Sequence, residues 1–283
     1  MATDISDLKL LRRKTESGMV DCLRALEESG GDLAAAEALL KARGLAAAAE
    51  RSSRETREGR IFLHGAASGA VLVELACETD FVARNERFIA TGRKVAGLAC
   101  ARRLESPDAE MEELVAGLAA VVKENLSLRR IACLAAGESE RVEGYVHGEG
   151  RVGSLVLARA EPGAALADGR VRAFLHDLAL QVAAFKPRYI GEGSVPGSVL
   201  AEMASRLGEE VEGDEATREK SGPIKAGIVA GRTRKRLSAL CLMSQGFLRD
   251  EDRSVAAVVE SLGGETGCAI RVLDFACLAV GET

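Results

Sequence analysis

The chain has 283 residues, of which 47% are hydrophobic and 29% are charged, and its net charge is −5. This composition is that of an ordinary globular protein, and the length leaves room for two domains. The negative charge argues against a protein that binds DNA or RNA mainly through an excess of basic residues. No apolar run reaches the roughly 18 residues of a membrane span, and residues 1–13 lack the apolar stretch of a secretory signal. We therefore expect a cytoplasmic protein without a membrane partner.

Seven cysteines are scattered along the chain, and no two of them are separated by only two residues. This spacing favours reduced, mostly buried thiols over a disulfide framework or a zinc site. The three histidines are far apart, no set of nucleophile and base stands out, and no phosphate-binding loop ending in Gly-Lys-Ser/Thr occurs. We therefore predict neither an enzyme nor a protein that carries a metal or a cofactor.

The first 45 residues predict a bundle of three short helices. Ser6 is a candidate N-cap of the first helix, Gly18 separates the first helix from the second, and Asp32 is a candidate N-cap of the third. Gly44 is expected to end the third helix. A unit of this size has a thin core and resembles the ubiquitin-associated fold, whose members often serve as docking modules.

A partly helical linker is predicted for residues 46–60, after which the hydrophobic period becomes that of strands. Residues 61–139 predict a hairpin, two helices and a strand. Residues 140–283 predict a similar order again at a spacing of about 80 residues. We therefore expect an α+β protein with two related subdomains, each built on an antiparallel sheet, the second carrying an inserted helical hairpin. The predicted strands are 61–64, 70–76, 131–135, 141–147, 152–160 and 268–276, and the predicted helices are 86–103, 108–124, 171–185, 199–212 and 224–240.

The stretch Cys77–Asn85, with the sequence CETDFVARN, places an aromatic ring at the boundary between a strand and a helix. The chain has only seven Phe and two Tyr, so an aromatic residue at this position draws attention. Two interpretations stand side by side. Either Phe81 packs into its own core while Asp80 caps the following helix, or Phe81 is an exposed probe for another protein.

Three further motifs have an ordinary structural explanation. The glycines of Gly148–Gly153 have the spacing of a dinucleotide-binding loop, but a strand follows them where that loop needs a helix, so we predict a hairpin turn. The basic cluster Arg232–Arg236 is predicted to be a solvated helix face, offset by the acidic run at 209–215. His147 ends a strand at a hairpin tip, where an exposed side chain can touch a partner.

Four blocks of sequence together resemble translation elongation factor Ts, in that family's order and at similar spacing. They are TESGMVDCLRAL at residues 15–26, CETDFVARN at 77–85, GYVHGEGRVGSLV at 144–156, and residues 186–190. The block around Asp80 and Phe81 is the most specific of them. The helical N-terminal unit and the doubled α+β core also fit the family, so the resemblance covers nearly the whole chain.

The resemblance implies a guanine-nucleotide exchange factor that binds elongation factor Tu in its GDP-bound and nucleotide-free states. In the family, the acid and the ring that match Asp80 and Phe81 insert between two helices of the nucleotide domain of Tu. This insertion displaces elements that hold the magnesium ion and the phosphates. The other contacts that the resemblance implies are Thr79 and Val82 beside the ring, Leu11, Met19 and Val20 in the bundle, His147 at the hairpin tip, and the helical region 221–247.

The sequence departs from the family pattern at three places. Val20 stands where the family usually has Met. Glu50 and mixed charges up to Glu58 occur where basic residues are common, and Gly246 replaces a Pro, which should make its loop more flexible. Two other functions, neither of them enzymatic, are also consistent with the residues. One is a protein-binding module of the ubiquitin-associated type at 1–45, and the other is an RNA-binding protein that uses the basic cluster at 232–236, although RNA is not the expected partner.

Overall fold

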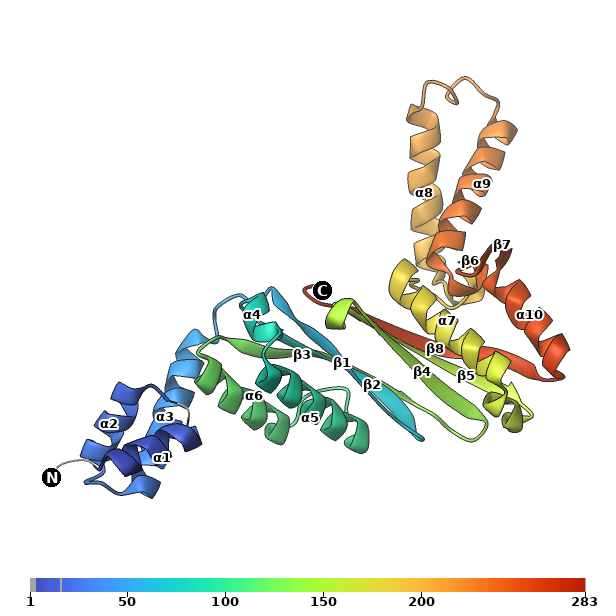
Figure 1. Ribbon diagram of the computed structural model, residues 1–283. Coiled ribbons are helices and arrows are strands. Elements are labelled where there is room, and N and C mark those ends of the chain that lie inside the picture. Colours follow the sequence, from blue (N-terminus) through green and yellow to red (C-terminus); the bar gives the residue numbers. More distant parts are fainter. Residues whose placement is uncertain (1–3, 16, 283) are drawn as a thin grey trace.

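The computed structural model describes residues 4–15 and 17–282. It has an N-terminal helical bundle, a central core of sheets and helices, and a long helical hairpin that projects from the core (Figure 1). The sheets are small and antiparallel, so the predicted α+β class is confirmed. In the part of the chain that is described, none of the helices combines the length and the apolar character that crossing a membrane requires.

The bundle consists of α1 (Ile5–Thr15), α2 (Met19–Glu28) and α3 (Leu33–Arg51). Asp32 caps α3 as predicted, because its carboxylate accepts hydrogen bonds from the backbone N–H groups of residues 34 and 35 at 2.8 and 3.1 Å. Ser6 does not cap α1. Asp4 occupies that position and accepts from the Ser6 N–H at 2.9 Å. The small core of the bundle is formed by Leu11, Cys22, Ala25, Leu26, Ala36 and Leu40.

The prediction that Gly44 ends the third helix is wrong, because α3 continues to Arg51. Residues 46–49 are four consecutive alanines, which favour helix more than any other residue. Gly44 is needed for packing, because a Cβ there would lie 2.9 Å from the Cβ of Ala120 on the neighbouring helix α6. The first part of the predicted linker is therefore a rigid helical extension that packs against the core.

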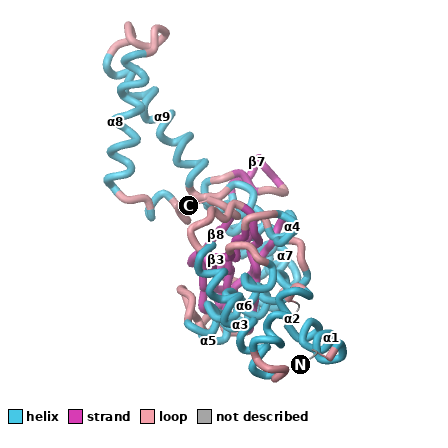
Figure 2. Tube along the Cα trace, turned by 90° about the vertical axis from the view of Figure 1, so that its left-hand side faces the viewer, coloured by secondary structure: helices cyan, strands magenta, loops and turns pink. Residues whose placement is uncertain are grey.

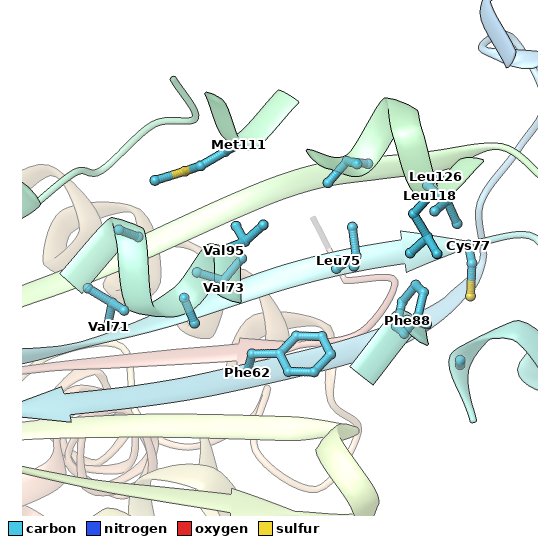
Figure 3. Packing of buried hydrophobic residues seen from close by; sticks show 14 of the residues in the cluster. Phe62, Val71, Val73, Leu75, Cys77, Phe88, Val95, Met111, Leu118 and Leu126 are labelled. Atoms are coloured by element: carbon cyan, nitrogen blue, oxygen red, sulfur yellow. The ribbon is translucent and has the colours of Figure 1, made fainter. Parts of the chain in front are cut away.

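The first subdomain is a three-stranded antiparallel sheet in the order β1 (Glu58–Ala66), β2 (Gly69–Cys77) and β3 (Leu126–Ala135). One face is covered by α5 (Glu86–Arg102) and α6 (Ala109–Val122). Figure 3 shows this layer, in which the sheet and the two helices enclose one apolar core. The residues labelled there include Phe62, Val71, Val73, Leu75, Phe88, Val95 and Met111.

The second subdomain repeats this plan with β4 (Glu140–His147), β5 (Val152–Glu161) and β8 (Ala269–Ala279), covered by α7 (Gly169–Phe185) and α10 (Val255–Thr266). In each sheet the middle strand pairs with the third strand through a register shift. The shift lies between Glu74 and Leu75 in the first sheet and between Leu157 and Ala158 in the second. The same strand order and a bulge at the same place support the predicted relation between the two subdomains.

The two sheets pack face to face, so the core has helices on both outer sides. Ile61 and Leu72 from the first sheet meet Leu155 and Leu278 from the second. Strand β2 is therefore buried along its whole length, since one face meets the helices and the other meets the second sheet. The relative position of the two subdomains is fixed by this shared interior.

The helical hairpin consists of α8 (Gly197–Gly213) and α9 (Gly222–Leu240), as predicted from the sequence. It extends away from the core in both views (Figures 1 and 2). At its base, the buried Gln181 of α7 donates to the side-chain oxygen of Gln245 and to the carbonyl of Gly246, each at 3.1 Å. Short strands β6 (Gly246–Phe247) and β7 (Asp250–Ser254) follow, and neither they nor α10 were predicted. Short 3-10 turns lie at Gly148–Gly150, Gly163–Ala167, Glu192–Ser194 and Leu242–Ser244.

Two glycines of α5 give a matched test of the packing between this helix and β1. A Cβ on Gly92 would lie 2.2 Å from the ring of Phe62, whereas a Cβ on Gly97 would be 3.8 Å from its nearest neighbour, His64. We expect Gly92→Ala to lower the free energy of unfolding by about 1–3 kcal/mol through overpacking. Gly97→Ala should raise it by about 0.5–1 kcal/mol, because alanine is the better helix former. Urea unfolding of both variants measures the difference, and equal effects would contradict this packing.

Candidate interaction site

Phe81 lies on a single helical turn, α4 (Asp80–Ala83), that joins β2 to α5. Its side chain is 82% exposed, so it does not pack into its own core. The next two residues are anchored instead, since Val82 packs against the core of the first subdomain and Ala83 is buried. The turn therefore holds an apolar ring in water at a fixed place, which is unusual for Phe.

Thr79 and Asn85 define the two ends of this segment. The Thr79 hydroxyl accepts a hydrogen bond from the Val82 N–H at 3.4 Å and so caps α4. Asn85 caps α5 by accepting from the Arg87 N–H at 2.9 Å. Asp80 therefore caps neither helix, and its carboxylate lies 3.5 Å from the guanidinium of Arg84 with almost half of the Asp80 side chain exposed. Asp80 and Phe81 thus both face outward.

Two loops clamp the start of α4 by exchanging hydrogen bonds. The carboxylate of Glu124 accepts from the Thr79 N–H at 3.0 Å and from the Thr79 hydroxyl at 2.6 Å. In return, the carboxylate of Glu78 accepts from the Asn125 N–H at 2.6 Å. Bonds to a charged acceptor are the stronger kind, so these contacts hold the ring firmly. Asn125 extends the clamp to the end of α3 by donating to the carbonyls of residues 52 and 54.

The far end of α4 is tied to the second subdomain. The Arg60 side chain donates to the carbonyl of Ala83 at 2.6 Å, and its guanidinium also lies 3.5 Å from the carboxylate of Glu149. Glu149 belongs to the turn between β4 and β5, next to His147. Phe81 and His147 therefore stand on elements joined by a single arginine, and both elements lie on the same side of the core (Figure 1).

His147 is exposed at the end of β4, as predicted for a hairpin tip. Its Nδ1 atom is 3.0 Å from the hydroxyl of Tyr145, and the ring of Tyr145 meets His176 edge-on at 5.8 Å. These contacts orient the imidazole without burying it. The turn that follows has positive φ at Gly148, Glu149 and Gly150, and strand β5 comes directly after it. The glycine motif is therefore a hairpin turn and not a dinucleotide-binding loop.

The bundle presents a second apolar surface. Met19 and Val20 at the start of α2 are 45% and 67% exposed, and Leu23 beside them is 37% exposed. Leu11 is different, because it is completely buried in the bundle core. A direct contact between Leu11 and a partner is not available in this conformation, so Leu11 supports the surface from inside.

Other candidate residues are accounted for by internal contacts. Burial raises the pKa of the Cys77 thiol to about 12, with Glu124 and Glu58 adding to the shift, so the thiol stays protonated and donates to the Thr79 carbonyl at 3.1 Å. In the basic cluster, Arg232 pairs with Asp214 and Arg236 pairs with Glu210 of α8. All seven cysteines are free thiols. Over residues 4–15 and 17–282, His, Cys, Asp and Glu form no group of three able to hold a metal.

Comparison with known proteins gives the family. The model of the family described as "Elongation factor TS" matches residues 78–282. The chain belongs to the elongation factor Ts family. Elongation factor Ts of Treponema denticola is 34% identical over 98% of this chain and 97% of its own length. That of Symbiobacterium thermophilum is 38% identical over 96% of this chain and 90% of its own length.

Membership of the elongation factor Ts family confirms the resemblance found in the sequence and identifies the chain as a factor of protein biosynthesis. Elongation factor Ts of Treponema pallidum is 36% identical over 94% of each chain. The matched region of the family model begins one residue before Thr79, so it includes α4 and all of the second subdomain, whereas β1 and β2 of the first subdomain precede it. The bundle precedes this region, but the relatives cover it.

We expect Thr79→Val to loosen α4, because it removes the hydroxyl that caps the turn and bonds Glu124. The free energy of unfolding should fall by about 1–3 kcal/mol. Hydrogen exchange of the amides of residues 80–83, followed by mass spectrometry, should become faster at the same time. Thr79→Ser keeps the hydroxyl and serves as the control. If both variants exchange alike, the hydroxyl does not hold the turn.

Proposed function

We propose that this protein is the guanine-nucleotide exchange factor of elongation factor Tu and promotes release of GDP during translation elongation. Family membership supports this assignment. The observation that carries it is the 82% exposure of Phe81 on a turn that is hydrogen-bonded at both ends. A ring held in this way is prepared to enter a pocket on another protein without first rearranging its own chain.

Exchange of this kind needs no bond chemistry in the factor. If binding of the factor weakens nucleotide on Tu, nucleotide must weaken the factor by the same ratio, because the two equilibria are linked. The factor therefore has to bind the nucleotide-free form of Tu more tightly than the GDP-bound form. The free energy for this preference must come from contacts that exist only when Tu has opened.

Phe81 is suited to supply that contact. Burying an exposed Phe side chain contributes about 2–3 kcal/mol, and in our proposal the ring fits its pocket only after two helices of the Tu nucleotide domain have separated. The gain offsets the loss of magnesium and phosphate contacts in Tu. Asp80, whose side chain is also almost half exposed, accepts a charge-assisted hydrogen bond from a donor in the same pocket. Thr79 and Val82 flank the ring and keep it exposed, since Thr79 caps the turn and Val82 packs against the core.

The remaining contacts are assigned by exposure. Met19 and Val20 provide an apolar docking surface for the nucleotide domain, and His147 provides a further contact close to α4. These surfaces bind Tu in every nucleotide state, so they set affinity, whereas Phe81 sets the preference for open Tu. Leu11 contributes only by keeping α2 in place.

Phe81→Ala should lower the rate of GDP release from elongation factor Tu by more than tenfold. Because the ring is exposed in the free protein, truncation removes little internal packing, and the melting temperature should stay unchanged. Stopped-flow release of fluorescent GDP measures the first effect and circular dichroism the second.

Val121→Ala is the matched control, since Val121 is also an exposed apolar residue on a helix but lies on α6 and not on α4. It should release GDP at the wild-type rate. A Phe81→Ala variant that also exchanges like the wild type would refute the assignment of the ring.

The double variant Met19→Ser, Val20→Ser should raise the Kd for nucleotide-free Tu by about tenfold, because less apolar area is removed from water. The maximal release rate at saturating factor should remain close to that of the wild type. Ile5→Ser is the control, since Ile5 is as exposed as Val20, at 67%, but lies on α1. Titrations of the release rate against factor concentration separate the two parameters. A lower maximal rate with an unchanged Kd would overturn this division of roles.

A further inference from the structure

A cleft of about 550 Å³ lies between the N-terminal bundle and α6. Its walls come from α1, α2 and α3 on one side and from the end of α6 on the other, and no residue of α4 or of the β4–β5 turn lines it. The cleft is therefore separate from Phe81 and His147, although α2, which carries Met19 and Val20, forms part of its wall. It is of the size that small ligands occupy. Six cationic side chains line it, namely Lys14, Arg24, Lys41, Arg43, Arg51 and Lys123.

Four of these six cations already have acidic partners. Two of the partners, Asp21 and Glu37, also line the cleft, and the other two, Glu28 and Glu113, do not. Among the residues that the structure describes, the cleft thus contains more cationic than acidic side chains, although the whole chain has a net charge of −5. The four pairs are Lys14 with Glu37 at 3.4 Å, Lys41 with Glu113 at 3.6 Å, Arg43 with Glu28 at 2.5 Å, and Lys123 with Asp21 at 4.0 Å.

Arg24 and Arg51 are the two cations left over. Within residues 4–15 and 17–282, neither side chain has an ion-pair or hydrogen-bond partner. The Nε–H of Arg51 is in addition buried, with no acceptor. A buried donor without an acceptor is destabilising, and a bound ion is one of the few ways in which a native protein satisfies such a group. This donor belongs to a residue that lines a cleft of ligand size.

We propose that this cleft binds a small anion carrying two or more phosphate groups. A guanidinium offers two parallel N–H donors, which match the oxygens of a phosphate, and Arg remains charged at every physiological pH. Arg24 and Arg51 come from different helices, so an anion with two phosphates can engage both at once. Lys123, whose pair with Asp21 at 4.0 Å is long, supplies a third charge from the core side.

Binding at this site would join the bundle to the first subdomain. The phosphate groups would bridge Arg24 of α2, Arg51 of α3 and Lys123 at the end of α6. Two ion pairs already cross the same boundary, Lys123 with Asp21 and Lys41 with Glu113, but both are exposed and therefore weak. The bound anion thus fixes the direction in which the bundle presents α2.

The test uses the full chain alone, without elongation factor Tu, so its result does not depend on the proposed exchange function. Isothermal titration calorimetry with sodium tripolyphosphate should show one saturable site, and the anion should raise the melting temperature. Arg24→Met and Arg51→Met keep the aliphatic stems and should each weaken binding by more than tenfold. Arg13→Met is the control, because Arg13 is an exposed cation on α1 outside the cleft, and it should bind as the wild type does.

Two comparisons make the result decisive. Without anion, Arg51→Met should melt at or above the wild-type temperature, because the substitution removes a buried donor that has no acceptor. A lower melting temperature would show that Arg51 stabilises the fold and would overturn the proposal. Titration with ADP separates the sources of phosphate: tighter binding of ADP than of tripolyphosphate identifies a nucleotide, and the reverse identifies the phosphate chain alone. Three outcomes would each reject the site. The first is no saturable heat with either anion, and the second is equal binding by Arg51→Met and the wild type. The third is an equal melting shift with sodium chloride at the same ionic strength.

Discussion

The exposed position of Phe81 depends on the exchange of hydrogen bonds between two loops. Glu124 accepts from Thr79, and Glu78 accepts from the residue that follows Glu124, so each loop satisfies backbone donors of the other. An apolar ring in water gains by folding back onto its own chain, and a free loop would allow it to do so. The clamp prevents this collapse, because Val82 is fixed beside the ring and packs inward. The site therefore owes its form to polar contacts beneath it.

The spatial relation between the ring and the rest of the surface depends on the packing of the two sheets. Glu74 is fully buried at the bulge of β2, where it pairs with Arg130 at 2.7 Å and accepts from the Gly281 N–H at 3.1 Å. Arg130 also donates to the carbonyl of Ala279 at 2.7 Å. Breaking a buried pair leaves an unpaired charge, so this junction resists sliding of one sheet over the other. The distance between α4 and His147 is set by that rigidity.

Secondary structure could be predicted from the sequence where a hydrophobic period continues over a long segment. Both hairpins, α5, α7 and the projecting helices follow from hydrophobic pattern and breakers alone. Helix α10 was not predicted, because Val255, Val258 and Val259 are poor helix formers. In the folded protein, tertiary packing overrides that preference. The family block drew attention to Phe81, but the hydrogen bonds that hold its turn could not be predicted from the sequence. Glu124 follows Thr79 by 45 residues and contacts it only in the folded protein. Leu11 was expected to contact Tu because of the family resemblance, but its side chain is buried in the bundle core, where α2 and α3 cover it.

If Phe81 acts as we propose, a rigid probe and a linked equilibrium are sufficient for nucleotide exchange, and the factor needs no chemical step. Ordering a flexible loop on binding would cost conformational entropy, and that cost would subtract from the preference for open Tu. Here the backbone of α4 is hydrogen-bonded at both ends in the free protein, so under the proposed mechanism most of the free energy of burying Phe81 would be available to favour the open state. The same reasoning explains the polar setting of the ring, since an apolar foundation would compete with the partner for the same side chain. In this proposal, the hydrogen bonds that hold α4 in place therefore also produce the preference of the factor for open Tu.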